Sequence, residues 1–135
     1  VFIRIYALKP YVEFLGSRDD VPELMNRALA LVVASRTEGF GLAAVEAMSQ
    51  GCVVIGNDTT GMKEQFDIGK DFTGDEIGLR YSGISQLAQA LHLAASENVD
   101  FSAMRERARL TVLNEYPVAK MVGNIEDFYL KVLNR

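Results

Sequence analysis

Two short apolar runs separated by a helix-forming segment place the strongest constraint on the fold of this chain. Residues 31–34 and 52–55 are each about as long as a strand, and the second run is rich in β-branched side chains. Between them, residues 41–50 predict a helix, and Gly51 is a natural left-handed stop for it. A strand, a helix and a strand in this order predict a right-handed crossover between parallel strands.

The segment before these elements extends the same alternation. Residues 12–15 form another apolar run, which predicts a third buried strand. Asp20, Pro22 and Glu23 are typical of a helix start, and this helix is expected to run to about Ala30. The sequence therefore predicts an α/β fold of the Rossmann-like type, in which helices cover both faces of a parallel sheet in three layers.

The second half of the chain is less regular. Residues 57–78 are rich in Gly, Asp and Thr and predict a loop with a short helix near residues 63–66, followed by a short strand at 79–81. Residues 85–96 predict an amphipathic helix, with His92 beside its apolar stripe. Apolar side chains recur at helical spacing through residues 118–133, so we expect a terminal helix that packs this face on the core.

Composition narrows the class of protein. The 135 residues suffice for one domain at a typical ~100 to 200 residues per domain, and the net charge of −4 without a Lys/Arg run argues against a nucleic-acid partner. The longest apolar run, residues 28–34, is far shorter than the ~20 residues of a membrane-spanning helix. One cysteine, Cys52, and one histidine, His92, exclude an internal disulfide and argue against a zinc site. A reducing cytoplasm is the expected compartment, and the start on Val1 suggests a fragment.

The stretch that follows the strand at residues 31–34 carries the residues best suited to chemistry. Gly39 and Gly41 let the backbone approach a ligand closely, and the free amides at the start of the next helix favour a phosphate. Open α/β sheets bind ligands at this end of their strands. The carboxylates of Glu38 and Glu46 suit the hydroxyls of a sugar or a ribose, so a nucleotide sugar would match both groups.

A purely structural interpretation of the two glutamates is also available. Glu38 would then be a favourable charge near a helix N-terminus, and Glu46 a solvated helix residue. Against this, Glu46 stands between Val45 and Ala47 in a helix of small and apolar residues, where an unpaired charge would be unfavourable.

This block resembles the C-terminal, donor-binding domain of GT-B glycosyltransferases of the family 4 type. The E-x7-E motif of that family is matched by Glu38 and Glu46, within a segment that ends in Glu46-Ala47-Met48. Other parts fall in the family's order, namely residues 12–16, Gly51 with the strand after it, Gly61 with Glu64, and the closing helices in residues 105–133. Thr60 and Lys63 interrupt the family's typical Gly-Gly-x-Pro loop.

The resemblance implies roles for individual residues. Glu46 would bind the ribose hydroxyls, and Glu38 would lie beside the donor sugar, as the candidate catalytic residue that stabilises positive charge at the anomeric carbon. The backbone amides of Gly39, Phe40, Gly41 and Leu42 would meet the sugar and the distal phosphate. Gly16 and Ser17 would lie near the base.

The resemblance also implies a reaction and its partners. Such enzymes transfer a sugar with retention of anomeric configuration, from a UDP- or GDP-linked donor and without a metal, to a glycan or lipid acceptor. Basic residues that clamp the diphosphate lie upstream of the part matched here, and the acceptor-binding N-terminal domain is missing from this chain. The chain would then bind donor without turnover, in an enzyme that acts in the cytoplasm or peripherally at its membrane face.

Two other classes of protein fit part of the sequence. Residues 39–44 also match G-x-G-x-x-A after a strand, and Asp58 follows 17 residues beyond Gly41, as in the dinucleotide-binding unit of an oxidoreductase. There, however, Glu38 would place a carboxylate next to a pyrophosphate. A receiver-type phosphoacceptor domain would use Asp19, Asp20 and Asp58, but no suitably placed lysine follows Tyr81.

Overall fold

A three-stranded parallel sheet organises the computed structural model, which describes residues 7–133. The strands are β1 (Ala30–Val33), β2 (Val53–Asn57) and β3 (Leu79–Tyr81), in the order β1-β2-β3. Ala30 pairs with Val53, and Ile55 pairs with Leu79. All three strands were predicted within two residues, and the α/β, Rossmann-like class is confirmed.

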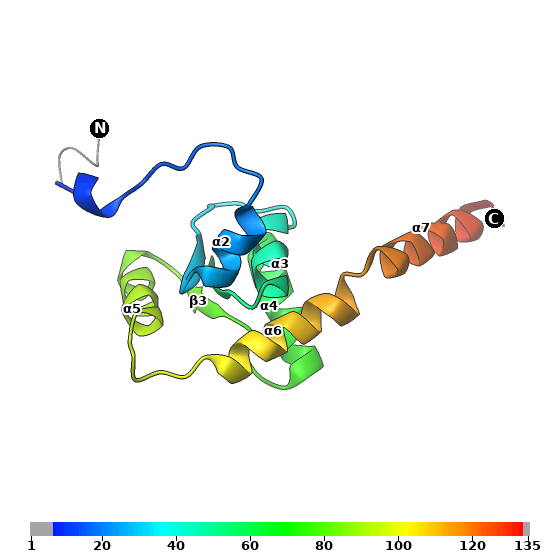
Figure 1. Cartoon of the computed structure of the whole chain (residues 1–135). Coiled ribbons are helices and arrows are strands. Elements are labelled where there is room, and N and C mark those ends of the chain that lie inside the picture. Colours follow the sequence, from blue (N-terminus) through cyan, green and yellow to red (C-terminus); the bar gives the residue numbers. More distant parts are fainter. Residues whose placement is uncertain (1–6, 134–135) are drawn as a thin grey trace.

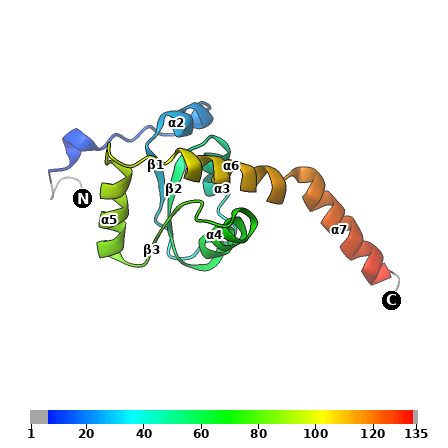
Figure 2. The same cartoon turned by 90° about the horizontal axis from the view of Figure 1, so that it is seen from below.

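Helices cover both faces of this sheet (Figures 1 and 2). On one face, α3 (Leu42–Ser49) and α4 (Thr60–Thr73) pack on β2, and α6 (Ser102–Glu115) packs across both helices. On the other face, α5 (Ile84–Ala94) packs on β2 and β3. The short helix α2 (Val21–Arg27) lies against α3, and a 3-10 helix, η1 (Lys9–Tyr11), precedes it in the chain.

The alternation of side chains along β2 divides the core between the two faces. Val54 belongs to the larger cluster, which Phe66 and Met62 of α4 and Met48 of α3 complete. Ile55, the next residue, points to the opposite face and joins Tyr81 and Ala90. This is the pattern that a central parallel strand buried on both faces requires.

The segment at residues 12–15 does not form the strand that its apolar pattern predicted. It runs as an exposed coil ahead of α2, with the Phe14 side chain 83% exposed. Apolar character alone does not make a strand, because a strand also needs a neighbour to satisfy its backbone hydrogen bonds. Within the described residues, no strand pairs with this segment.

Two helix boundaries also differ from the sequence-based expectation. The predicted loop at residues 57–78 contains α4, a helix of 14 residues rather than a short one near residues 63–66. Its buried face, which includes Met62, Phe66 and Gly69, packs on the sheet and offsets the low helix propensity of its glycines. The first helix, α2, ends at Arg27 instead of near Ala30, because the chain enters β1 there.

The terminal helix forms as predicted but does not pack on the core. α7 (Val118–Leu133) extends away from the sheet and its helices (Figure 1), and it has no buried residue. Its apolar side chains are exposed, including Phe128 at 63%. The helical period identifies an apolar face, whereas the turn at Pro117 decides where that face points. In the described part of the chain, no helix is both long and apolar enough to cross a membrane.

An ionic network ties α4 to β3 through Arg80. The Arg80 guanidinium donates to Asp67 (2.6 Å) and Glu76 (3.0 Å), and it lies 5.2 Å from the centre of the Phe66 ring. Hydrogen bonds from Lys63 and Arg80 hold the pKa of Asp67 below its ordinary value. Burial raises the pKa of Glu76, but hydrogen bonds from Lys70 and Arg80 outweigh it, so that this pKa is also lowered.

Replacing Arg80 with methionine should therefore make stability less sensitive to acid. Carboxylates with lowered pKa values stabilise the fold above pH ~4, and this contribution is lost as the pH falls through their folded pKa values. We expect Arg80→Met to lower the free energy of unfolding at pH 7 by about 1 kcal/mol, after allowing for solvent screening of Asp67. In urea titrations the gap to wild type should narrow at pH 3, and an equal gap at both pH values would contradict this. Arg109→Met, at an exposed pair with Glu106, is the control and should leave the urea midpoint unchanged.

Candidate functional site

The candidate site lies at the carboxyl end of β1, where the sequence placed it. The chain leaves β1 at Val33 and enters α3 at Leu42, with Glu38 half-buried and Phe40 exposed in the connecting loop. Gly41 closes the loop with φ 77° and ψ 53°, a left-handed conformation that favours glycine. A Cβ at Gly41 would also lie 3.2 Å from Cγ of Glu38. This glycine therefore sets both the turn and the start of α3.

The loop is held from one side by the segment that joins β2 to α4. Asn57 donates to the Ser35 carbonyl (3.2 Å), and the Thr59 hydroxyl to the Arg36 carbonyl (3.4 Å). The Gly61 N–H and the Thr60 hydroxyl both donate to the Glu38 carbonyl, at 3.0 and 2.8 Å.

Gln65 completes this set of contacts, because its side-chain Nε2 donates to the Phe40 carbonyl. Sequence reasoning missed Thr60 and Gln65, and the one signal for either was the departure of Thr60 from a Gly-Gly pattern.

These contacts determine where the loop amides point. In a planar trans peptide the carbonyl and the following N–H point in opposite directions. Because the carbonyls of Glu38 and Phe40 face α4, the N–H groups of Gly39 and Gly41 are turned to the opposite, open side of the loop. Backbone amides presented in this way suit an anion or the hydroxyl oxygens of a sugar.

The close approach of α4 to the loop depends on Gly61. A Cβ at this position would lie 2.4 Å from the Gly39 carbonyl oxygen and 2.9 Å from that of Glu38. Both are backbone atoms, which cannot move aside as a flexible side chain can. The preceding residue, Thr60, has φ 39°, a left-handed conformation that is a genuine outlier for a β-branched residue and is unfavourable by ~1–3 kcal/mol.

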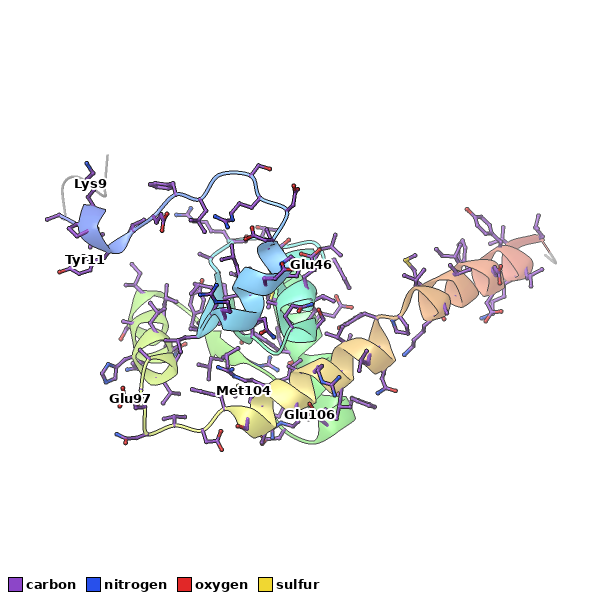
Figure 3. All side chains as sticks on the ribbon, in the orientation of Figure 1. Lys9, Tyr11, Glu46, Glu97, Met104 and Glu106 are labelled. Atoms are coloured by element: carbon purple, nitrogen blue, oxygen red, sulfur yellow. The ribbon has the colours of Figure 1, made fainter. Side chains whose placement is uncertain are left out.

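Glu46 lies on α3 beside α2 (Figure 3), and its surroundings differ from the expected ones. Its side chain is exposed, so its charge requires no buried partner and the argument from apolar neighbours was wrong. It lines a groove of about 320 Å³ between the two helices, together with Val21, Pro22 and Met25 of α2 and Ser49 and Gln50 at the end of α3. The groove combines an apolar wall with a carboxylate at its rim.

Gly16 and Ser17 lie in the exposed coil ahead of α2. Gly16 adopts a left-handed φ of 69°, and no atom lies within 4 Å of a Cβ built there. No hydrogen bond in residues 7–133 joins Gly16 or Ser17 to the loop at Glu38. The structure thus brings together Glu38, Gly39, Phe40, Gly41 and Leu42, and places Glu46 one helix turn further on.

A second, mainly apolar groove of about 800 Å³ separates the loop from α7. Phe40 and Leu42 line one side, and Met121, Ile125 and Phe128 line the other. The Phe40 ring meets the Tyr116 ring edge to face at 5.3 Å between centroids. Burial, reinforced by the negative charges of Glu115 and Glu64, raises the pKa of Tyr116 to about 12.

The sheet, its helix layers and the loop at the end of β1 define the class of this protein as a Rossmann-like α/β domain with a ligand site of the kind such sheets carry. The family model described as "Glycosyl transferases group 1" matches residues 2–110, and the chain belongs to this family. The three-stranded parallel sheet is consistent with the C-terminal domain of the GT-B fold. This assignment decides against both the oxidoreductase and the receiver-domain alternatives.

Curated relatives agree with the family. The chain is 34% identical over 122 residues to N-acetyl-alpha-D-glucosaminyl L-malate synthase of Bacillus anthracis, with 90% of this chain and 31% of the relative covered. It is 33% identical to GDP-mannose:cellobiosyl-diphosphopolyprenol alpha-mannosyltransferase of Xanthomonas campestris, covering 84% of this chain and 29% of the relative. It is 29% identical to UDP-Gal:alpha-D-GlcNAc-diphosphoundecaprenol alpha-1,3-galactosyltransferase of Escherichia coli, covering 93% and 31%. The chain therefore spans about a third of the length of these relatives.

Proposed function

We propose that this chain is the donor-binding part of a retaining glycosyltransferase that uses a UDP- or GDP-linked sugar. The observation that carries the proposal is the loop at Glu38, whose Gly39 and Gly41 amides turn away from α4 at the N-terminus of α3. A diphosphate is the group best matched to these amides. The names of two relatives include UDP-Gal and GDP-mannose, which supports a nucleotide-sugar donor and leaves the base open.

The two glutamates have separate roles in this proposal. Glu46, at the rim of the groove between α2 and α3, accepts hydrogen bonds from the ribose hydroxyls, while Val21, Pro22 and Met25 contact the nucleoside. Gly16 and Ser17 approach the base from the coil ahead of α2. Glu38 lies on the sugar side of the diphosphate, where its negative charge stabilises the positive charge that develops at the anomeric carbon as the diphosphate leaves.

The remaining parts of the proposal concern the whole enzyme. The leaving diphosphate is neutralised by loop amides and by basic side chains from outside this chain, so no metal cofactor is required. A glycan or a lipid-linked acceptor, as in the names of the polyprenol-specific relatives, binds to a domain that this chain does not include. The chain alone thus binds donor without transferring its sugar, and the full enzyme works in the cytoplasm or peripherally at the membrane.

Substitution of each glutamate separates these roles. Glu46→Ala should weaken binding of UDP or GDP by about tenfold or more, because it removes one or two hydrogen bonds to a charged group. Glu38→Ala should leave the free nucleotide nearly unaffected and weaken only the sugar-bearing donor, tested with UDP-galactose and GDP-mannose by isothermal titration calorimetry. Glu126→Ala, on exposed α7, is the matched control and should change neither affinity. Unchanged nucleotide affinity in Glu46→Ala would reject the proposed role of Glu46.

A further inference from the structure

Thr60 combines an unfavourable backbone with an unusual pair of contacts. Its φ of 39° is readily adopted by glycine and rarely by a β-branched residue. Its hydroxyl accepts a hydrogen bond from the Glu38 N–H (3.0 Å) and donates one to the Glu38 carbonyl (2.8 Å). A glycine at this position would remove the strain and would also remove both contacts.

The two contacts fix the Glu38 backbone on both sides of its Cα atom. Within residues 7–133 the Glu38 carboxylate itself takes part in no hydrogen bond or ion pair. The direction of this carboxylate is therefore set by its backbone rather than by a side-chain partner. The α4 side of the loop holds that backbone through Thr60 and Gly61.

We propose that Thr60 is a positioning residue, whose hydroxyl orients Glu38 toward the sugar of the bound donor and whose strained backbone is retained for that purpose. The inference rests on the proposed function, because it assigns Glu38 a donor sugar to face. Thr60 itself touches no reacting atom. Strained residues that persist in a fold are typically held there by the surrounding structure at a functional site.

Three substitutions separate orientation of Glu38 from ordinary stabilisation. Thr60→Ser keeps the hydroxyl, Thr60→Val keeps the shape and the strain without the hydroxyl, and Thr60→Gly removes both the hydroxyl and the strain. For each variant we would measure amide hydrogen exchange at Glu38, the urea midpoint, and the affinity for UDP, GDP, UDP-galactose and GDP-mannose.

The expected pattern differs between stability and binding. Thr60→Ser should match wild type within about twofold in every affinity. Thr60→Val and Thr60→Gly should both speed Glu38 exchange and weaken the sugar-bearing donor by about five- to tenfold, with free nucleotide affinity unchanged within twofold. The urea midpoint should fall in Thr60→Val and remain at or above the wild-type value in Thr60→Gly, because only the glycine relieves the strain.

The failure of this inference is distinguishable from the failure of the proposed function. If wild type binds a nucleotide or its sugar, and Thr60→Gly binds the sugar-bearing donor as tightly as wild type, Thr60 is merely structural and the inference is wrong. If wild type binds none of the four compounds, the donor-site proposal is contradicted, and the positioning role is overturned with it.

Discussion

Gly61→Ala is expected to disrupt the site more than any other change of a single carbon atom. The added Cβ would lie 2.4 Å from the Gly39 carbonyl oxygen, so α4 and the loop must move apart. This movement breaks the hydrogen bond from the Gly61 N–H to the Glu38 carbonyl and turns the loop amides out of register. We expect donor binding to fall below detection, and the free energy of unfolding to decrease by about 1–3 kcal/mol.

Gly123→Ala is the matched control for Gly61→Ala. Gly123 lies inside α7, and no atom lies within 4 Å of a Cβ built there. Alanine is favoured over glycine in a helix, so this variant should be as stable as wild type or slightly more stable, with unchanged binding. If Gly61→Ala bound nucleotide as wild type does, the close contact between α4 and the loop would not be needed for the site.

Phe66→Ala should cause the largest loss of stability. The Phe66 ring is fully buried at the centre of the larger core cluster, beneath the sheet and against Ile77 and Met62. A Cβ at Gly56 or Gly78 would lie within 3 Å of this ring, which shows how closely the strands approach it. Removing the ring leaves a cavity, so we expect the free energy of unfolding to decrease by about 3–5 kcal/mol, a large part of the ~5–15 kcal/mol of a typical domain.

Phe128→Ala makes the same chemical change on α7, where the ring is 63% exposed. We expect a decrease of less than about 0.5 kcal/mol, because little packing is lost. Urea unfolding followed by circular dichroism measures both variants under the same conditions. Equal losses in the two variants would mean that α7 packs on the domain in solution and that its position here is wrong.

The sheet was predictable from sequence because its signals are local. The apolar runs at β1 and β2, the helix between them and Gly51 all lie within 30 residues, and each carries its own pattern. The strand at residues 12–15 and the packing of α7 were wrong for a shared reason. Apolar character indicates that a surface tends to be buried, but the partner that buries it lies elsewhere in the chain or outside it.

The site divides in the same way. The loop from Glu38 to Leu42 could be placed at the end of a strand from its glycines and its position in the alternation of elements. The contacts that orient it come from Thr60, Gly61 and Gln65, more than 20 residues away, in a segment predicted mainly as loop. Because α4 is stabilised by packing and not by helix propensity, its residues could not be aligned with the loop from sequence alone.

The central claim is that the loop before α3 and the groove beside it bind a nucleotide-linked sugar. The most direct test is a titration of the ¹⁵N-labelled chain with UDP, GDP, ADP and NAD, followed by amide chemical shifts. We expect one nucleoside diphosphate to bind best and to shift the amides of Gly39, Gly41, Leu42 and Glu46, with the response lost in Glu46→Ala. Binding of NAD alone, or shifts confined to residues away from this loop, would contradict the claim.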